Sequence, residues 1–364
     1  MKNKKLDSQI VDEKVNTRRI YTGIDLFKLI AAVLVVLLHA IETTEGYLYE
    51  LKYVATLFVV PFFFIASGFF FYQGLSNTND RRSFFIKYEK KLLKLFVIWA
   101  LVLYLPFVIT SYIHNNPGAS VLKIVLLLVR RVFIIGPGPY WYLVALAWSV
   151  AFLYFCYEKR ESLLKIAIVL GLLIEICYTC FYGVLSQLFV FRILFRLIYF
   201  VYSWEFNFLM FGIPFAGIGF LLGKRELTWN KTNSVLIFAI ATLLRIVEYN
   251  LPQIVPGGFW ETNCISVAFI VQAIAFFMIA RSTEFSWSCA RTTKIRQLSS
   301  FIYFSHVIIL YNILNPVLSN YTTLPVYSGG MVLPKTLIVL LVCVLLFSVI
   351  KRIDNSRLNI LING

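Results

Sequence analysis

Hydrophobic stretches separated by short polar segments follow one another along almost the whole chain. Each is about 18 residues long or longer, which is the length that an α-helix needs to cross the hydrocarbon core of a bilayer. We therefore predict an all-α fold, a polytopic integral membrane protein with about ten transmembrane helices. The predicted spans cover residues 20–41, 53–75, 92–112, 140–157, 163–183, 206–223, 233–250, 262–280, 300–318 and 332–350.

These spans divide the chain into three parts. Residues 1–19 are predicted to be a polar cytoplasmic leader, residues 20–350 a transmembrane domain, and residues 351–364 a cytoplasmic tail. The first span does not fit a cleavable signal peptide, because its apolar run is too long, carries charge and lacks a small-residue cleavage site.

The first span and the residue that follows it carry four ionisable residues, Asp25, Lys28, His39 and Glu42. At about 100° per residue they fall within roughly a 100° arc of one helix face. Lys28 and His39 nearly share an azimuth and are separated by roughly 16 Å along the helix axis. Ionisable groups inside a span are costly, so they are usually buried against protein and functional. One helix is therefore predicted to place a cation toward one membrane face and an imidazole toward the other.

The composition agrees with a membrane protein, since 60% of the residues are hydrophobic and 14% are charged. The formal net charge of +16 raises the possibility of nucleic-acid binding, but Lys and Arg also concentrate in the cytoplasmic loops of membrane proteins. With the N-terminus inside, the predicted inner segments hold 25 basic residues and the outer segments hold seven. This asymmetry favours two cytoplasmic termini, and we expect the lipid bilayer as a partner and no nucleic acid.

Two predicted outer connections carry amphipathic patterns of their own. Val121–Ile135 is apolar apart from three basic residues and predicts a helix at the outer interface. The segment Gly183–Trp204 is rich in aromatic residues and carries Arg192 and Arg196 four positions apart. These arginines fit either anchoring to lipid headgroups or a basic wall for an anionic substrate.

No pattern in the sequence predicts a metal or nucleotide-phosphate site. Cys177 and Cys180 form a C-x-x-C inside a predicted span with no second pair nearby, so we interpret the cysteines as packing residues and predict no metal. A P-loop, a Rossmann glycine pattern and an H-E-x-x-H motif are all absent from the sequence.

Five local patterns, taken in order, resemble those of the membrane acyltransferase-3 family. The family has Arg or Lys, ten residues and then His in its first span, followed by an apolar run ending Ser-Gly-Phe, an aromatic W-[FY]-L segment, a G-x-P-F span and a late I-Y-x-x-H. In this chain Lys stands at the first position, where the family more often has Arg. The matching segments are Lys28–His39, Val60–Phe69, Tyr140–Leu146, Phe211–Gly223 and Leu298–His306.

The resemblance implies a membrane-bound transferase in the bacterial plasma membrane. Such a protein moves an acyl group, commonly acetyl, from cytoplasmic acyl-CoA (acetyl-CoA) to a hydroxyl of a cell-envelope polysaccharide or a small hydroxylated acceptor. Acyl-CoA is then a donor substrate, and we expect no bound cofactor. Donor phosphates require cations at the cytoplasmic mouth, so the predicted donor-binding residues are Lys28, Asp25, Arg81 and Arg82. The basic loop that contains the two arginines equally fits a plain topology signal.

Transfer to an alcohol requires a base for the hydroxyl proton or a nucleophile that carries the acyl group. His39 is the candidate for either role, because imidazole titrates near neutral pH, and Glu42 is predicted to fix its tautomer. A structural histidine is the alternative. The remaining candidates, which are predicted to bind the acceptor or to serve structural roles, are Ser67, Trp141, Tyr142, Arg192, Arg196, Tyr303 and His306.

A second hypothesis comes from relatives of this family that form the membrane half of amino-acid racemase proteins. That half is thought to take up serine, and the local segments Ile24–Ala32 and Val60–Phe64 look similar to it. On this reading the chain is a transport or sensing module for a small amino acid.

Overall fold

The computed structural model describes residues 20–42, 46–118, 120–202, 207–225, 227–254, 265–321, 328–353 and 358–362. The predicted leader, residues 1–19, lies outside the described residues, and so do parts of the predicted tail.

The described chain is helical. The α-helices are α1 (Thr22–Ala40), α2 (Gly46–Leu51), α3 (Val59–Ser76), α4 (Arg81–Leu95), α5 (Leu105–Asn115), α6 (Val121–Arg130), α7 (Trp141–Cys156), α8 (Glu161–Cys180), α9 (Tyr182–Leu185), α10 (Phe189–Tyr202), α11 (Ile213–Lys224), α12 (Lys231–Ile254), α13 (Val267–Ser282), α14 (Cys289–Val307), α15 (Asn315–Tyr321) and α16 (Val332–Ile353). Wider π-helical segments continue several of them, at Lys52–Thr56, Phe96–Tyr104, Arg131–Ile135, Phe208–Gly212 and Ile308–Leu314. Short 3₁₀ turns lie at Gly138–Tyr140, Gly329–Met331 and Leu358–Leu361.

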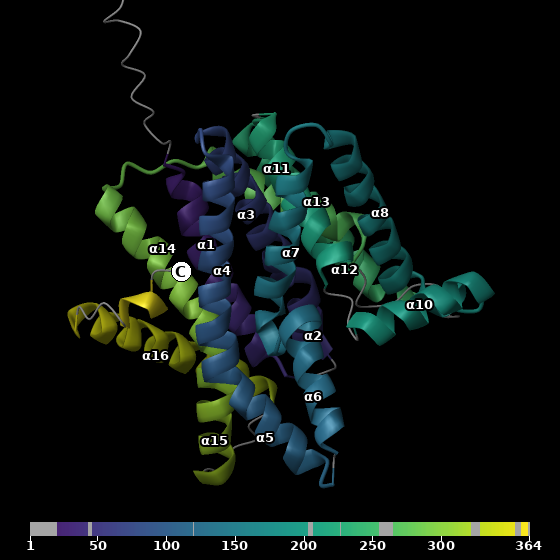
Figure 1. The fold of residues 1–364 in the computed structure, drawn as a ribbon, viewed down its shortest axis with the longest axis vertical. Coiled ribbons are helices and arrows are strands. Elements are labelled where there is room, and N and C mark those ends of the chain that lie inside the picture. The colour runs from purple at the N-terminus through teal and green to yellow at the C-terminus, as the bar shows by residue number, and fades with distance from the viewer. Residues whose placement is uncertain are drawn as a thin grey trace, which may run out of the picture.

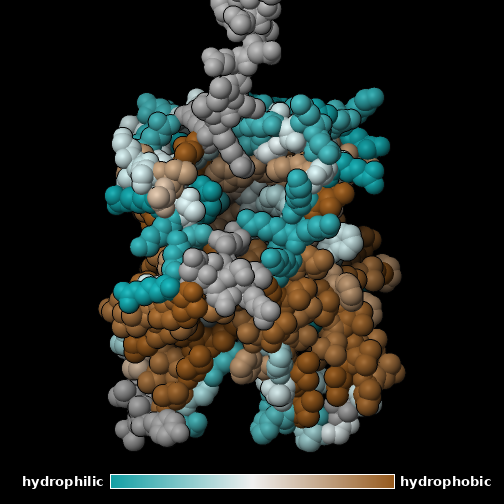
Figure 2. Space-filling view, turned by 60° about the vertical axis from the view of Figure 1, so that its left-hand side comes forward, coloured by the Kyte–Doolittle hydropathy of each residue, from teal (hydrophilic) through white to brown (hydrophobic). Residues whose placement is uncertain are grey.

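Within the described residues, eight helices are long and apolar enough to cross a membrane, and two shorter apolar helices span Phe208–Lys224 and Val267–Ser282. Together they correspond to the ten predicted spans, so the prediction of an all-α, multi-pass membrane protein is confirmed. Figure 2 shows hydrophilic residues gathered over its upper end and a broad hydrophobic band below them.

Some helices extend beyond the predicted spans. The third is continuous over Arg81–Asn115, although its first turns are strongly basic and were predicted to be a loop. Asp80 explains the early start, because its side chain accepts a hydrogen bond from the Ser83 backbone N–H at 2.9 Å and so caps the helix. The hydrophobicity pattern therefore predicted the apolar part of this helix and did not predict the polar turns that precede it.

The centre of the bundle is built on a close crossing of α3 and α11 (Figure 1). A Cβ added at Gly68 would lie 1.9 Å from the Ala216 carbonyl oxygen, and one added at Gly219 would lie 1.9 Å from the Ile65 carbonyl oxygen. The two glycines therefore let the two backbones touch, which is how small residues pack helices in membranes. This crossing fixes α3, whose other faces carry side chains of the site described below.

Replacing Gly219 by leucine should separate α3 from α11, because the new side chain would collide with backbone rather than with a movable side chain. We expect a loss of about 3 kcal/mol or more in the free energy of unfolding. The melting temperature of the purified protein in detergent, followed by size-exclusion chromatography after heating, measures the loss. Gly330→Ala is the control, since the nearest atom to its added Cβ is the Ser328 Oγ at 4.0 Å. Equal melting temperatures for wild type and Gly219→Leu would contradict the expected role of this crossing.

Both amphipathic outer connections contain helices. Val121–Ile135 is helical as α6 and its π-helical extension, and α10 extends away from the bundle at the right of Figure 1. The Arg130 guanidinium donates hydrogen bonds to the carbonyl oxygens of Tyr199, Phe200 and Val201, at 2.7 to 3.3 Å. Arg130 thus caps the C-terminal end of α10, where helix carbonyls lack intrahelical partners.

Candidate functional site

Two adjoining cavities enter the bundle beside α1, and they share Lys28 and Arg296 in their linings. The larger cavity has a volume of about 450 Å³ and lies between the beginnings of α1 and α14 and the end of α3. The smaller one, which we call the inner cavity, has a volume of about 190 Å³ and lies between α1, α3, α4, α7 and α14. We call the end of α1 at which they open the Lys28 end; the charge distribution predicts that it is cytoplasmic.

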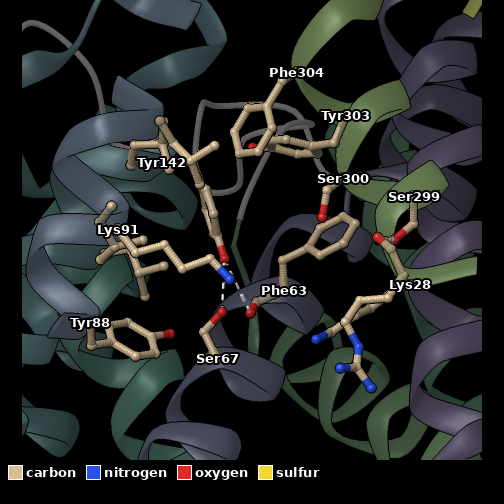
Figure 3. Close-up of a pocket in the computed structure, with 15 residues that line it drawn as sticks. Lys28, Phe63, Ser67, Tyr88, Lys91, Tyr142, Ser299, Ser300, Tyr303 and Phe304 are labelled. Carbon is tan, nitrogen blue, oxygen red and sulfur yellow. Dashed lines mark hydrogen bonds between the residues drawn. The ribbon is translucent and has the colours of Figure 1, made fainter. Parts of the chain in front are cut away.

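The inner cavity is lined by hydroxyl groups and cations (Figure 3). The Ser67 and Tyr142 hydroxyls lie 3.0 Å apart, and the Tyr142 hydroxyl also lies 3.3 Å from the Phe63 carbonyl oxygen. Lys91 and Lys28 reach toward the cavity from opposite sides in Figure 3. The further polar residues of the lining are Tyr88, Arg296, Ser299, Ser300 and Tyr303. This lining offers several hydrogen-bond donors and positive charges to a bound anion.

Arg296 is held at the cavity by Asp25. The guanidinium donates two hydrogen bonds to the Asp25 carboxylate, at 3.0 and 2.7 Å, in the bidentate geometry that suits arginine. The Asp25 side chain is 1% exposed and the Arg296 side chain 49% exposed. Asp25 was predicted to bind the donor; the structure places its carboxylate on Arg296 instead, because a buried carboxylate requires a cationic partner. Asp25 is therefore a positioning residue for the exposed guanidinium.

Lys28 lines both cavities, so its position is compatible with the predicted role in donor binding. Its ammonium lies 4.5 Å from the centre of the Phe70 ring, within the range of a cation–π contact. This contact and the neighbouring Arg296 keep two positive charges at the junction of the cavities.

Arg81 and Arg82 do not join this site. Both are exposed on the first turn of α4, and neither is in the lining of the two cavities. Arg81 pairs with Glu158 at 2.5 Å. The structure therefore favours the topological interpretation of these two arginines over donor binding.

The imidazole of His39 lies near the opposite end of α1, beside a second histidine. The rings of His39 and His306 have their centres 5.2 Å apart. His306 is fully buried, and its Nδ1 lies 3.1 Å from the Ile302 carbonyl oxygen. Since a carbonyl only accepts, Nδ1 carries the His306 proton. The Nε2 of His306 is buried and has no hydrogen-bond partner.

The tautomer of His39 is set by Tyr311. The Tyr311 hydroxyl donates its single proton to the His39 backbone carbonyl at 3.1 Å, and its oxygen lies 3.4 Å from the His39 Nδ1. The oxygen can then accept from Nδ1–H, which leaves Nε2 of His39 with the lone pair that a base requires. Glu42, which was predicted to fix this tautomer, has other partners: one of its oxygens accepts a hydrogen bond from Asn315 Nδ2 at 3.0 Å and the other pairs with the Lys335 ammonium.

Aromatic side chains connect the inner cavity with the two histidines. Tyr303 lies in the cavity lining, 5.5 Å from Tyr142 and 6.2 Å from His306 between ring centres. Neither His39 nor His306 is in the lining of the two cavities. The route from Lys28 to His39 thus runs through the inner cavity and then through the packed rings of Tyr303 and His306.

The remaining predicted residues lie away from this route. Trp141 packs against Phe64 and Phe211, with ring centres 5.8 and 5.6 Å apart. Arg192 and Arg196 are both exposed on α10, outside the lining of the two cavities, which fits headgroup anchoring better than a basic wall. Among the described residues, no three His, Cys, Asp or Glu side chains come together to hold a metal ion.

Several residues of the site escaped prediction because their sequence surroundings indicate other roles. Arg296 lies in a basic loop-like segment and was counted as a topology signal, as was Lys335. Tyr311 lies in an aromatic, apolar run. The late I-Y-x-x-H segment was the available signal for this region, because α14 supplies Ser299, Ser300 and Tyr303 to the inner cavity.

Comparisons with known proteins agree with one another. The family described as an acyltransferase domain matches residues 21–352. A curated amino-acid racemase from Enterococcus faecalis is 27% identical over an alignment of 244 residues, and the alignment covers 62% of this chain and 31% of the racemase. The chain thus spans about a third of the length of that relative. No solved structure matches the chain.

Proposed function

The protein belongs to the acyltransferase-domain family, and from that premise we propose that it transfers an acyl group, acetyl in the first instance, from cytoplasmic acyl-CoA to a hydroxyl group. The acceptor is a cell-envelope polysaccharide unit or a small hydroxylated molecule, and the site of action is the bacterial plasma membrane. The observation that carries this proposal is the arrangement along α1: a cationic double cavity begins at Lys28, and a basic imidazole nitrogen lies at His39.

The double cavity suits the phosphate-bearing part of an acyl-CoA. Lys28 and Arg296 supply two positive charges at its junction, and Arg296 offers a planar fork of donors that matches a phosphate. Lys91 adds a cation to the lining of the inner cavity. The thioester end would then point from the inner cavity toward Tyr303 and the histidines.

The proposed reaction is direct acyl transfer. His39 Nε2 removes the proton from the acceptor hydroxyl while its oxygen attacks the thioester carbonyl carbon. The tetrahedral intermediate collapses with cleavage of the carbon–sulfur bond, and the imidazolium returns the proton to the leaving thiolate. The products are the O-acyl ester and free CoA thiol. Tyr311 keeps the proton of the resting imidazole on Nδ1, which supports the role of Nε2 as the base.

The test uses purified protein in proteoliposomes with acetyl-CoA labelled on the acetyl group. The expected result is release of free CoA thiol together with label in a hydroxylated acceptor, here a mixture of neutral sugars. Thiol release without ester formation would show that the protein hydrolyses acetyl-CoA and does not transfer the acetyl group. The absence of both products would overturn the proposal.

Replacing Lys28 by alanine should raise the KM for acetyl-CoA by roughly 10- to 100-fold, because a charge-assisted hydrogen bond to a phosphate contributes about 1.5–3 kcal/mol. Lys28→Arg should restore most of the affinity, since it keeps the positive charge. Arg82→Ala is the matched control, because Arg82 is exposed and lies outside both cavities. An unchanged KM in Lys28→Ala, measured from initial rates of thiol release, would remove Lys28 from the donor site.

A second candidate function is movement of a small amino acid such as serine across the membrane. Its support is the match to an amino-acid racemase. Uptake of labelled L-serine into the same proteoliposomes, without consumption of acetyl-CoA, would favour transport over acyl transfer.

A further inference from the structure

One face of α14 carries polar side chains whose chemistry changes along the helix. Arg296, Ser300, Tyr303 and His306 follow one another at intervals of four, three and three positions, which places them within about a 120° arc of the helix. The first three line the inner cavity, and His306 lies next to His39. The face therefore begins with a cation at the Lys28 end, continues with two hydroxyls in the cavity and ends with an imidazole.

Tyr303 lies on this face between the cation and the imidazole. Seven positions of helix separate it from Arg296, which is roughly 10 Å along the axis. Its ring belongs to the lining of the inner cavity, and the ring centre lies 6.2 Å from that of His306. A donor whose phosphate meets Arg296 can therefore bring a group further along its length to Tyr303.

The hydroxyl of Tyr303 differs from those of the two tyrosines beside it. The Tyr140 hydroxyl donates to the Phe304 carbonyl oxygen at 2.5 Å, and the Tyr142 hydroxyl donates to the Phe63 carbonyl oxygen at 3.3 Å. The Tyr303 hydroxyl has no hydrogen-bond partner among the described residues, and no dashed line reaches it in Figure 3. Since polar groups inside a protein are nearly always hydrogen-bonded, a phenol that lines a cavity without a partner indicates a bound acceptor atom.

The ring that carries this hydroxyl is held by other aromatic rings. Its centre lies 5.1 Å from that of Phe63, 5.5 Å from that of Tyr142 and 5.2 Å from that of Phe304. The three contacts come from α3, α7 and α14, so the ring is fixed from several sides. A donor that is fixed before the reaction can stabilise a developing charge without the cost of reorganisation.

We propose that Tyr303 is a catalytic residue of the acyl transfer and that its hydroxyl donates a hydrogen bond to the carbonyl oxygen of the thioester. When the acceptor oxygen bonds to the carbonyl carbon, the π-electron pair moves onto the carbonyl oxygen, which becomes negatively charged. The phenol stabilises this oxyanion and keeps its own proton. Cleavage of the carbon–sulfur bond restores the carbonyl, and the thiolate takes its proton from the imidazolium of His39. The inference rests on the proposed function and adds the group that stabilises its intermediate.

Replacing Tyr303 by phenylalanine removes the hydroxyl and keeps the ring. We expect kcat for release of CoA thiol to fall by about 10²- to 10³-fold, which is the usual effect of removing one oxyanion donor. The KM for acetyl-CoA should change little, because Lys28 and Arg296 are untouched. Tyr154→Phe is the matched control and should keep wild-type kcat, since Tyr154 stacks on Phe85 with ring centres 4.4 Å apart and lies outside both cavity linings.

A wild-type kcat in Tyr303→Phe overturns this inference and leaves the proposed function in place. A residue with a structural role alone would lower the melting temperature without separating kcat from KM, so a variant whose kcat loss follows its loss of folded protein also overturns it.

A second measurement does not depend on turnover. A ketone analogue of acetyl-CoA, in which a methylene group replaces the sulfur, is bound to the protein in nanodiscs, and infrared spectroscopy records the stretching frequency of its isotope-labelled carbonyl. A hydrogen bond from Tyr303 lowers this frequency, so the frequency should be higher in Tyr303→Phe than in wild type. Equal frequencies in the two proteins, or no binding of the analogue to wild type, overturn the inference. If the frequencies differ as expected while no acyl transfer is detected, the carbonyl contact stands and the proposed reaction fails.

Discussion

Replacing His39 by alanine is expected to lower kcat for acyl transfer by about 10²- to 10⁴-fold, which is the usual contribution of a positioned general base. The imidazole sits beside His306, with its proton placed on Nδ1 by the Tyr311 hydroxyl. Removal of the ring deletes a basic lone pair whose direction is set by a defined partner, the Tyr311 hydroxyl. The KM for acetyl-CoA should change little, because the cationic cavities lie at the other end of α1.

The measurement is the initial rate of CoA thiol release at saturating donor and acceptor. His114→Ala provides a matched control, since His114 is exposed near the end of α5, and it should retain wild-type kcat. His306→Gln should lower kcat less than His39→Ala does, because His306 acts on the proposed base only through the contact between the two rings. A His39→Ala enzyme with wild-type kcat, folded by the same chromatographic criterion, would exclude His39 as base and as acyl carrier.

The polar face of α1 could be predicted from the sequence because it depends on local helix geometry alone. Eleven positions bring Lys28 and His39 to one side of a helix in any protein. The structure places side chains of α14 beside both residues, with Arg296 lining the same cavities as Lys28 and His306 next to His39. The same argument predicted the amphipathic helices α6 and α10, whose apolar stripes repeat with the period of a helix.

The partners of that face could not be predicted, because they depend on which helices pack together. Asp25 binds Arg296 across 271 positions of sequence, and Glu42 binds Lys335 across 293. Both cations were counted as loop charges, because a charge count uses the position of a residue along the chain and contains no information on where its side chain points.

Replacing Lys335 by methionine is expected to give a large loss of stability. Lys335 is 1% exposed, and its ammonium bonds to the Glu42 carboxylate. Removing one partner of a buried ion pair leaves an uncompensated charge and costs about 3–5 kcal/mol. The free energy of unfolding, measured by titration with SDS in mixed micelles, should fall by that amount. Lys351→Met is the control, because Lys351 is exposed on the same helix.

The double variant Glu42→Gln with Lys335→Met should recover most of that stability, because no buried charge then remains without a partner. Gln keeps a carbonyl oxygen that can accept from Asn315 Nδ2, so the hydrogen bond at 3.0 Å has a replacement. A double variant as unstable as Lys335→Met would show that the lysine stabilises the fold through contacts other than its pairing with Glu42. Recovery would show that the pair contributes little net stability, because the desolvation cost of burying two charges then offsets their mutual attraction.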